Sequence, residues 1–460
     1  MFIIDIKDLI RGNKLYIYIF LFILAGIYSI FSKSTLLIIL LFCFIITIFG
    51  ASINMKSLKK SIIIAGKGAE KGYGLIIIFS ILGILSASWF LSGTIPALIY
   101  FGIKIINPQY FYISVFFILS IFSFLLGSCF GSVGTIGIVL LSLGKSLGMD
   151  LFITGGAIVS GSYFGDRSSP TSSSANFVSI LTETNIYTNV KNMFKTGVGA
   201  YLLTSILYFY LGYNKENQYV DSRLIDQIPK KFEISYIVFL PLCILLFLCI
   251  IKYNVKKTMI LSSLSALLLA VFYQKFSGFY ILKSLVFGFE MISEEELANI
   301  IKGGGIVSMA TAVIMALLSC GMVKIFDETG ILEKISNKIG LVKEEWKLYL
   351  YTAVTAIFTA GISSSQSTSI LLTVQLMKKT YMDSGKTNEE LAIDIENTSV
   401  VLSGLIPWCI GITVPATMLG MKPLDLIPWS FYLYLIPFVT ILSKFIFKRK
   451  NVNNPLFIKR

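Results

Sequence analysis

The chain has 460 residues, of which 55% are hydrophobic and 14% charged, and its mean hydropathy is +0.80. Soluble chains carry about a quarter charged residues, so this composition excludes a soluble protein and indicates a polytopic membrane protein. Apolar runs near the roughly 20 residues that one membrane span needs recur from Leu15 to Phe447.

The net charge of +14 reports membrane orientation rather than a nucleic-acid partner. Lysine and arginine gather in short connections, chiefly at 56–71 and 448–460. Such basic connections face the cytoplasm of membrane proteins. We therefore expect a multi-pass protein of the cell inner membrane or plasma membrane, with lipid around it and both termini in the cytoplasm. A homodimer is left open.

The chain has no histidine, and its six cysteines lie in apolar stretches without a CxxC pair. These absences exclude histidine-based catalytic triads and HExxH metalloprotease sites. No disulfide framework, metal site or bound cofactor is expected. Any coupled proton must be carried by carboxylates, because no imidazole is present.

In chain order, residues 1–213 form an N-terminal transmembrane half, 214–232 a hydrophilic linker and 233–460 a C-terminal transmembrane half. Each half contains one conspicuous polar break, "SSPTSSSAN" at 168–176 and "GISSSQSTS" at 361–369. Interrupted apolar segments at corresponding places in two halves point to the binding site of a transporter. Ordinary extramembrane loops are the alternative, because Ser, Thr and Asn favour turns.

The two breaks supply most of the candidate ion- or substrate-binding residues. Their hydroxyl and amide oxygens, together with exposed helix ends, suit a dehydrated Na⁺ or a substrate carboxylate. Helix capping and small-residue packing are the structural alternative. The candidates are Ser172, Ser173, Ser174 and Asn176 in the first break, and Ser364, Ser365, Gln366, Ser367 and Thr368 in the second.

Two acids complete the residue-based set. Asp166 stands at the polar end of the run before the first break, and Glu396 precedes a later apolar run. Ionisable side chains within a membrane mark functional sites, although a boundary salt bridge or a helix-starting acid would explain either one. Arg167 is expected to be a topological anchor, and Asp394 to be solvated.

Six stretches resemble the NhaC-type sodium/proton antiporter family, in the same order, over residues 74–425. The resemblance implies an all-α polytopic protein with two inverted repeats, broken helices and re-entrant hairpins. The stretches are "LSGTIPALIYFGIKIINPQYF" (91–111), "GSVGTIG" (131–137), "GAIVSGSYFGDRSSP" (156–170), "GGGIVSM" (303–309), "GISSSQSTSILL" (361–372) and "ENTSVVLSGLIPW" (396–408).

Two positions depart from that family. The resemblance places an aspartate where this chain has Ser173, and a Glu-Asp pair where it has Glu396 and Asn397, while Asp166 and Glu396 keep the family acids. Asn397 is therefore also a candidate ion- or substrate-binding residue. The resemblance implies Na⁺/H⁺ antiport by alternating access, with Na⁺ and H⁺ as cargo. The neutral residues leave open a Na⁺- or H⁺-coupled transporter or exchanger of a small organic anion or amino acid.

Other function classes fit less well. A membrane-embedded enzyme would need a base for its serine nucleophile, and neither histidine nor a lysine lies near the hydroxyl clusters. The chain has no Walker or nucleotide-binding fingerprint, which argues against an ATP-driven pump. A passive channel is separated from a transporter only by coupling, since a transporter builds one gradient from another.

Overall fold

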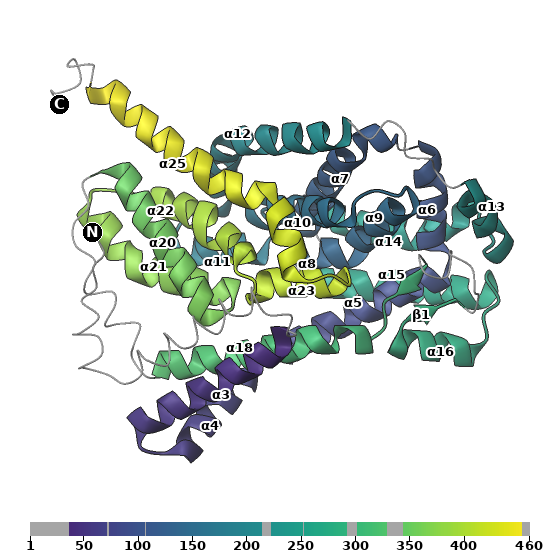
Figure 1. Ribbon diagram of the computed structural model, residues 1–460, viewed down its shortest axis with the longest axis horizontal. Helices are drawn as coiled ribbons and strands as arrows, with labels where there is room; N and C mark the ends of the chain where they lie inside the picture. The colour runs from purple at the N-terminus through teal and green to yellow at the C-terminus, as the bar shows by residue number, and fades with distance from the viewer. Residues whose placement is uncertain are drawn as a thin grey trace.

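The computed structural model describes residues 36–70, 73–105, 107–213, 222–251, 253–291, 301–328 and 344–452. Nearly all of these residues are helical, which confirms the predicted all-α membrane fold (Figure 1). The exception is a two-residue antiparallel pair, β1 (Phe289–Glu290) with β2 (Lys302–Gly303). Of the expected linker, 214–221 lies outside the described residues, and Ser222–Lys231 forms helix α13.

Several elements are too short or too bent to be plain membrane spans. Among the described residues, two helices are long and apolar enough to cross a membrane, or up to five if each of three bent pairs counts as one span. The bends measure 66°, 52° and 46°. The straight helices are Pro108–Leu126 and Cys129–Ser146; the bent pairs are Ile76–Leu91 with Thr94–Ile105, Asn388–Leu405 with Ile410–Met418, and Pro423–Trp429 with Phe431–Ile446.

Two segments, which we call the first module (111–182) and the second module (345–418), share one plan. In each, a helix leads through a tight turn into another helix, and a later helix is interrupted. The first module contains α7 (Phe111–Leu126), α8 (Cys129–Ser132), a π-helical turn (Val133–Gly137), α9 (Ile138–Ser146), α10 (Leu151–Ser168) and α11 (Ser173–Thr182). The second contains α20 (Glu345–Ser363), α21 (Gln366–Asp383), α22 (Asn388–Ile395), a π-helical turn (Glu396–Val400), a 3-10 turn (Ser403–Leu405) and α23 (Ile410–Met418).

The tight turns have the same backbone conformation. α7 ends at Gly127 in the left-handed region (φ 61°), and Ser128 follows in an extended conformation (φ −153°, ψ 122°). α20 ends at Ser364 in the same region (φ 53°), and Ser365 follows with φ −138° and ψ 128°. A left-handed residue ends a helix by turning the chain away from its axis.

The helix breaks also match. Each begins with an extended residue before a proline, at Ser169–Pro170 and at Ile406–Pro407, because proline disfavours helix at the preceding residue. The separation along the chain is the same from Gly127 to Pro170 as from Ser364 to Pro407. The polar stretch at 361–369 therefore corresponds to the turn at 127–128, rather than to the polar stretch at 168–176 as its composition suggested.

Each turn touches the break of its own module. An added Cβ at Gly127 would lie 2.4 Å from Thr171 Oγ1, and the Ile410 N–H donates to the Ser364 carbonyl over 2.8 Å. The last carbonyls of α7 and α20 gain donors from the same breaks, which satisfies groups that a helix end leaves free. Ser169 Oγ donates to Phe124 O over 2.6 Å, and Trp408 Nε1 donates to Gly361 O over 2.7 Å.

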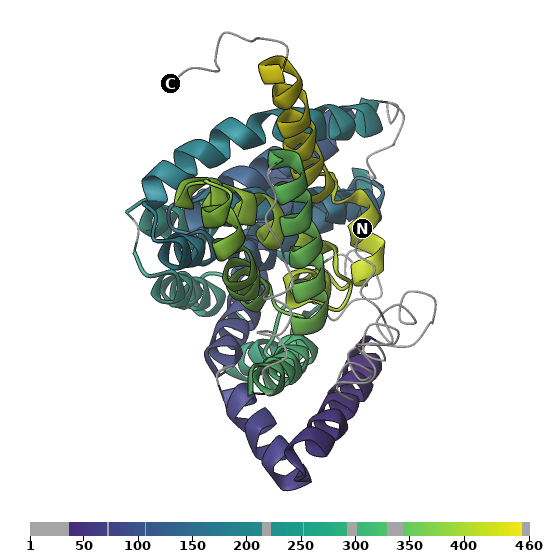
Figure 2. The same cartoon turned by 90° about the vertical axis from the view of Figure 1, so that its left-hand side faces the viewer.

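The remaining helices surround the modules. α12 and α25 pack together and cover one side, while α3, α4 and α18 form a group that projects from the body (Figure 2). Figure 1 places α8, α10 and α23 at the centre. The helices around the modules are α3 (Leu36–Met55), α4 (Leu58–Glu70), α5 (Tyr73–Leu91), α6 (Thr94–Ile105), α12 (Ile186–Tyr213), α14 (Leu240–Ile250), α15 (Val255–Phe272), α16 (Gly278–Phe287), α18 (Ala310–Glu328), α24 (Pro423–Leu426) and α25 (Phe431–Val452).

Candidate functional site

Asp166 lies where the two modules meet. It is two residues from the end of α10 and 5% exposed. Its Oδ2 accepts from Gln366 Nε2 over 2.9 Å, and its Oδ1 lies 3.4 Å from the Ser172 hydroxyl that donates to it. Ser174 Oγ donates to the Asp166 carbonyl over 2.9 Å and lies 2.8 Å from Ser172 Oγ. The first break thus folds back on the carboxylate that precedes it.

Gln366 links this carboxylate to the second module. It is the first residue of α21, directly after the turn at Ser364 and Ser365. Its side-chain nitrogen donates both to Asp166 and to the carbonyl of Val400, the latter over 3.1 Å. One amide group therefore contacts the last turns of α10 and the π-helical turn that follows α22.

Glu396 is a fully buried carboxyl group without a hydrogen-bond donor. It opens the π-helical turn, and within the described part of the chain neither of its oxygens has a hydrogen-bond partner. The next residue, Asn397, accepts hydrogen bonds from the guanidinium group of Arg167. Burying an isolated ionised carboxylate is very costly, so this group requires a cation or a proton. π-helical turns inside helices are often found at functional sites.

Three buried hydroxyls of the second module also have no partner within the described part of the chain. They are Ser364 Oγ, at the turn between α20 and α21, Ser399 Oγ, in the same π-helical turn as Glu396, and Thr413 Oγ1, in α23. Buried polar groups are nearly always hydrogen-bonded. Such atoms are therefore available to a bound cation, whose dehydrated form needs oxygen ligands.

Arg167 is fully buried, so the expectation of a topological anchor at the membrane boundary is wrong. Its Nε and one terminal nitrogen donate to Asn397 Oδ1 over 3.0 and 2.5 Å. The break directly after α10 turns the chain back into the protein and keeps this side chain inside. Its other acceptors are Ser168 Oγ, Tyr432 OH, Met193 O and Thr196 Oγ1, at 3.1, 3.3, 3.1 and 3.2 Å.

Asn397 is held by protein groups on every side. Its side-chain oxygen accepts from Arg167, and its side-chain nitrogen donates to Thr440 Oγ1 over 3.1 Å. Its backbone carbonyl accepts from Tyr349 OH over 3.2 Å. The residue therefore joins the second module to Arg167 and to α25. Its side-chain oxygen already accepts two hydrogen bonds, both from Arg167.

Not all of the sequence-predicted residues enter this cluster. Ser173 and Ser367 are exposed in the first turns of α11 and α21, because neighbouring residues of a helix face different directions. Asn176 closes the first break by donating to Pro170 O and Ser172 O over 2.9 and 2.7 Å. Ser365 is the extended residue of the second turn, and Thr368 is half-buried.

The sequence interpretation missed two polar clusters. Thr359 Oγ1 lies 3.0 Å from Ser369 Oγ and 2.9 Å from Thr373 Oγ1, between α20 and α21. Asp394, which we expected to be solvated, is 2% exposed and accepts from Lys444 Nζ over 2.6 Å and from Tyr381 OH over 2.8 Å. The signals available were the Ser369–Thr373 spacing of one helical turn and a lysine within the last apolar run.

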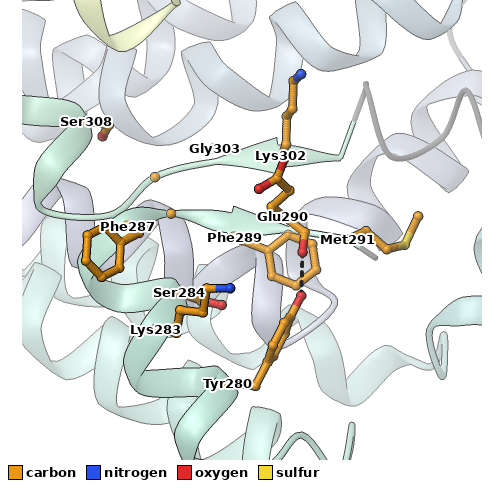
Figure 3. A pocket seen from close by; sticks show the side chains of 12 residues that line it. Tyr280, Lys283, Ser284, Phe287, Phe289, Glu290, Met291, Lys302, Gly303 and Ser308 are labelled. Atoms are coloured by element: carbon orange, nitrogen blue, oxygen red, sulfur yellow. Dashed lines mark hydrogen bonds between the residues drawn. The ribbon is translucent and has the colours of Figure 1, made fainter. Parts of the chain in front are cut away.

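A cavity of about 810 Å³ lies elsewhere, beside α16 and the β1–β2 pair (Figure 3). Lys283, Glu290 and Lys302 contribute its charged side chains, and Tyr280 OH donates to Glu290 O over 2.7 Å. It shares no residue with the cluster around Asp166. In the described ranges, no group of three or more Asp, Glu, Cys or His residues could hold a metal ion.

Broken helices, touching helix turns and buried carboxylates at their junction define a membrane-integral secondary transporter. A family model described as the Na⁺/H⁺ antiporter family matches residues 161–446. The chain belongs to this family, and the NhaC-type resemblance is confirmed.

Similarity to individual relatives extends over most of the chain. The chain is 27% identical to the Na⁺/H⁺ antiporter NhaC of Alkalihalophilus pseudofirmus, over 82% of each protein. It is 25% identical to a malate-2H⁺/Na⁺-lactate antiporter of Bacillus subtilis, over 86% of each. It is 24% identical to the arginine/ornithine antiporter ArcD of Halobacterium salinarum, over 81% of this chain and 79% of the relative.

Proposed function

We propose that this transporter exchanges Na⁺ for H⁺ by alternating access, with Asp166 and Glu396 as the groups that meet the transported ions. The observation that carries the proposal is the Glu396 carboxyl group, which is buried without a hydrogen-bond partner in the described part of the chain. A proton neutralises such a group by covalent attachment, and Na⁺ neutralises it by coordination. The two ions would therefore exclude one another at this place.

The neighbouring oxygens would complete the shell of Na⁺. Na⁺ is a hard cation that prefers carboxylate, hydroxyl and carbonyl oxygens. Asp166 and Ser172 would supply them from the first module, and Ser364 and Ser399 from the second. The remaining predicted residues, including Ser173, Ser174, Ser365, Ser367 and Thr368, would line the path or shape the turns.

The two modules would be the inverted repeats that the family resemblance implies. Their shared plan supports this, because one fold unit inserted twice in opposite orientations gives related halves. The basic connections support a cell-membrane protein with both termini in the cytoplasm. Membrane lipid would then surround the modules, and two copies of the chain could associate as a homodimer.

A small organic anion or amino acid is the second candidate cargo. The neutral residues at 173 and 397 support it, and relatives are named for malate, lactate, arginine and ornithine. In that case Na⁺ or H⁺ would be the coupled ion rather than the main cargo.

Purified protein in vesicles containing a pH-sensitive dye tests these alternatives. Na⁺ pulses should change the internal pH, and Glu396→Gln should abolish the change, because an amide cannot release a proton. Glu389→Gln, an exposed acid on the same helix, is the matched control and should transport at the wild-type rate. Proton movement driven only by organic solutes would favour the second cargo. Solute flow that builds no opposing gradient would indicate a channel.

A further inference from the structure

Arg167 is a permanent cation whose hydrogen bonds, among the residues that the structure describes, all go to neutral groups. A guanidinium group stays protonated in proteins. Its acceptors are an amide oxygen, three hydroxyls and a backbone carbonyl, and the side chain is fully buried. A buried charge without compensation is strongly destabilising. The compensating charge must therefore lie near Arg167 without a direct hydrogen bond to it.

Asp166 and Glu396 supply that charge. Asp166 precedes Arg167 in the chain, and Glu396 precedes the Asn397 that holds the guanidinium group. Gln366 also links Asp166 to Val400, which lies in the same π-helical turn as Glu396. The other buried acid of this region, Asp394, is matched by Lys444 at 2.6 Å. Two carboxylates and one guanidinium leave the ionised site with one uncompensated negative charge.

We propose that Arg167 is a built-in cation that fills the place of one transported cation, so that the site carries one monovalent cation at a time. This inference rests on the proposed Na⁺/H⁺ exchange. With either Na⁺ or H⁺ bound, the site is electrically neutral. Exchange is then one-for-one and moves no net charge across the membrane.

Asn397 is part of the same device. Its neutral oxygen orients the guanidinium group through two hydrogen bonds without adding a charge. An aspartate of nearly the same shape at this position would keep those bonds and give the ionised site a second uncompensated negative charge. Loss of the Arg167 charge would have the same electrostatic result by a different route.

The test is the voltage dependence of Na⁺-driven proton movement in vesicles, with the membrane potential set by K⁺ and valinomycin. For the wild type, the balance point should lie where the Na⁺ ratio equals the H⁺ ratio, whatever the potential. Asn397→Asp and Arg167→Gln should shift that ratio by about tenfold for each 59 mV per charge moved. Arg167→Lys keeps the charge and should remain independent of voltage even if it is slower.

One further variant separates charge from structure. Arg167→Gln combined with Asp166→Asn restores a single negative charge, on Glu396, so any Na⁺/H⁺ exchange that it retains should again balance independently of voltage. If Arg167→Gln fails to fold, Asn397→Asp alone decides the result. A voltage-dependent wild type, or variants that balance as the wild type does, would overturn the inference. Absence of any Na⁺/H⁺ exchange in the wild type would instead overturn the proposed function.

Discussion

The two modules use one backbone plan but distribute their polar groups differently. In the first, Asp166 stands directly before the break, and Ser172 and Ser174 of that break hold its carboxylate and carbonyl. In the second, Glu396 lies in a π-helical turn well before the break and has no hydrogen-bond partner in the described part of the chain. The repeated fold therefore positions two carboxyl groups, while the local sequence decides which one receives hydrogen bonds from the protein.

The tight turns of the two modules also share a backbone conformation but differ in the side chain that adopts it. Gly127 occupies the left-handed conformation without strain, whereas Ser364 occupies it at a cost of about 1 kcal/mol or more for a residue with a Cβ. Gly127 packs closely against Thr171, and the buried Ser364 hydroxyl has no hydrogen-bond partner among the residues that the structure describes. The first turn is therefore built for close packing, and the second has a side chain available to an ion.

Gly127→Ala should have the largest effect on this comparison. The added Cβ would lie 2.4 Å from Thr171 Oγ1 and 2.5 Å from its backbone carbon, so the turn and break must separate. We expect a loss of about 3 kcal/mol of unfolding free energy, measured by thermal melting in detergent. A melting temperature equal to that of the wild type would show that the first turn is not closely packed.

Gln366→Ala should break the link between the modules. It removes the donors to Asp166 and Val400, and a hydrogen bond to a charged group contributes roughly 1.5–3 kcal/mol. The apparent Na⁺ constant should rise by about tenfold or more, measured from Na⁺-driven pH changes in vesicles. The matched control is Gln375→Ala, an exposed glutamine of the same helix that should bind Na⁺ as the wild type does. Equal effects of the two variants would contradict the assigned contact.

Ser364→Gly should separate stability from ion binding. It gives the second turn the residue type of the first and removes both the strained conformation and the unpartnered hydroxyl. We expect a gain of about 1 kcal/mol in unfolding free energy, together with weaker Na⁺ binding. Melting curves and Na⁺ titrations measure the two effects. Unchanged Na⁺ binding would mean that this hydroxyl is not a ligand.

The smallest expected effect concerns a surface contact between the second module and the residue that directly follows the first. Lys378 donates to Glu183 over 2.8 Å, and this hydrogen bond and charge lower the pKa of the Glu183 carboxyl group. Since the pKa is lower in the folded state, the contact stabilises above the usual glutamate pKa and is lost as the pH falls through the folded value. Glu183→Gln should change the melting temperature only slightly at pH 7, and this change should vanish in acid. A change that persists in acid would indicate a different role for Glu183.

Hydropathy predicted a polytopic membrane protein and the two polar stretches predicted interrupted segments, while the all-α fold with broken helices was implied by the family resemblance. The pairing of the breaks was not predictable from composition, because glycine at 127 produces the same turn as serine at 364 without adding polarity. Clustered hydroxyls marked Ser172 and Ser174 correctly as neighbours of Asp166, but also included Ser173, which faces outward.

The burial of Arg167 and Asp394 could not be inferred from local sequence. The acceptors of Arg167 come from residues as distant as Asn397 and Tyr432, and the partner of Asp394 is Lys444. The local sequence around a charged residue beside a polar stretch looks the same whether that residue faces water at the membrane boundary or is buried in the protein. Only the folded arrangement separates the two cases.

The ion pair between Asp394 and Lys444 constrains how the protein is made. Lys444 lies near the end of α25, the last described helix, so the ribosome completes it long after Asp394 has been synthesised. Until α25 arrives, α22 carries an uncompensated acid, which is costly to place in a membrane. We therefore expect the second module to reach its final position only after α25 has entered the membrane. Chains truncated before Lys444 should accumulate as substrates for membrane proteases.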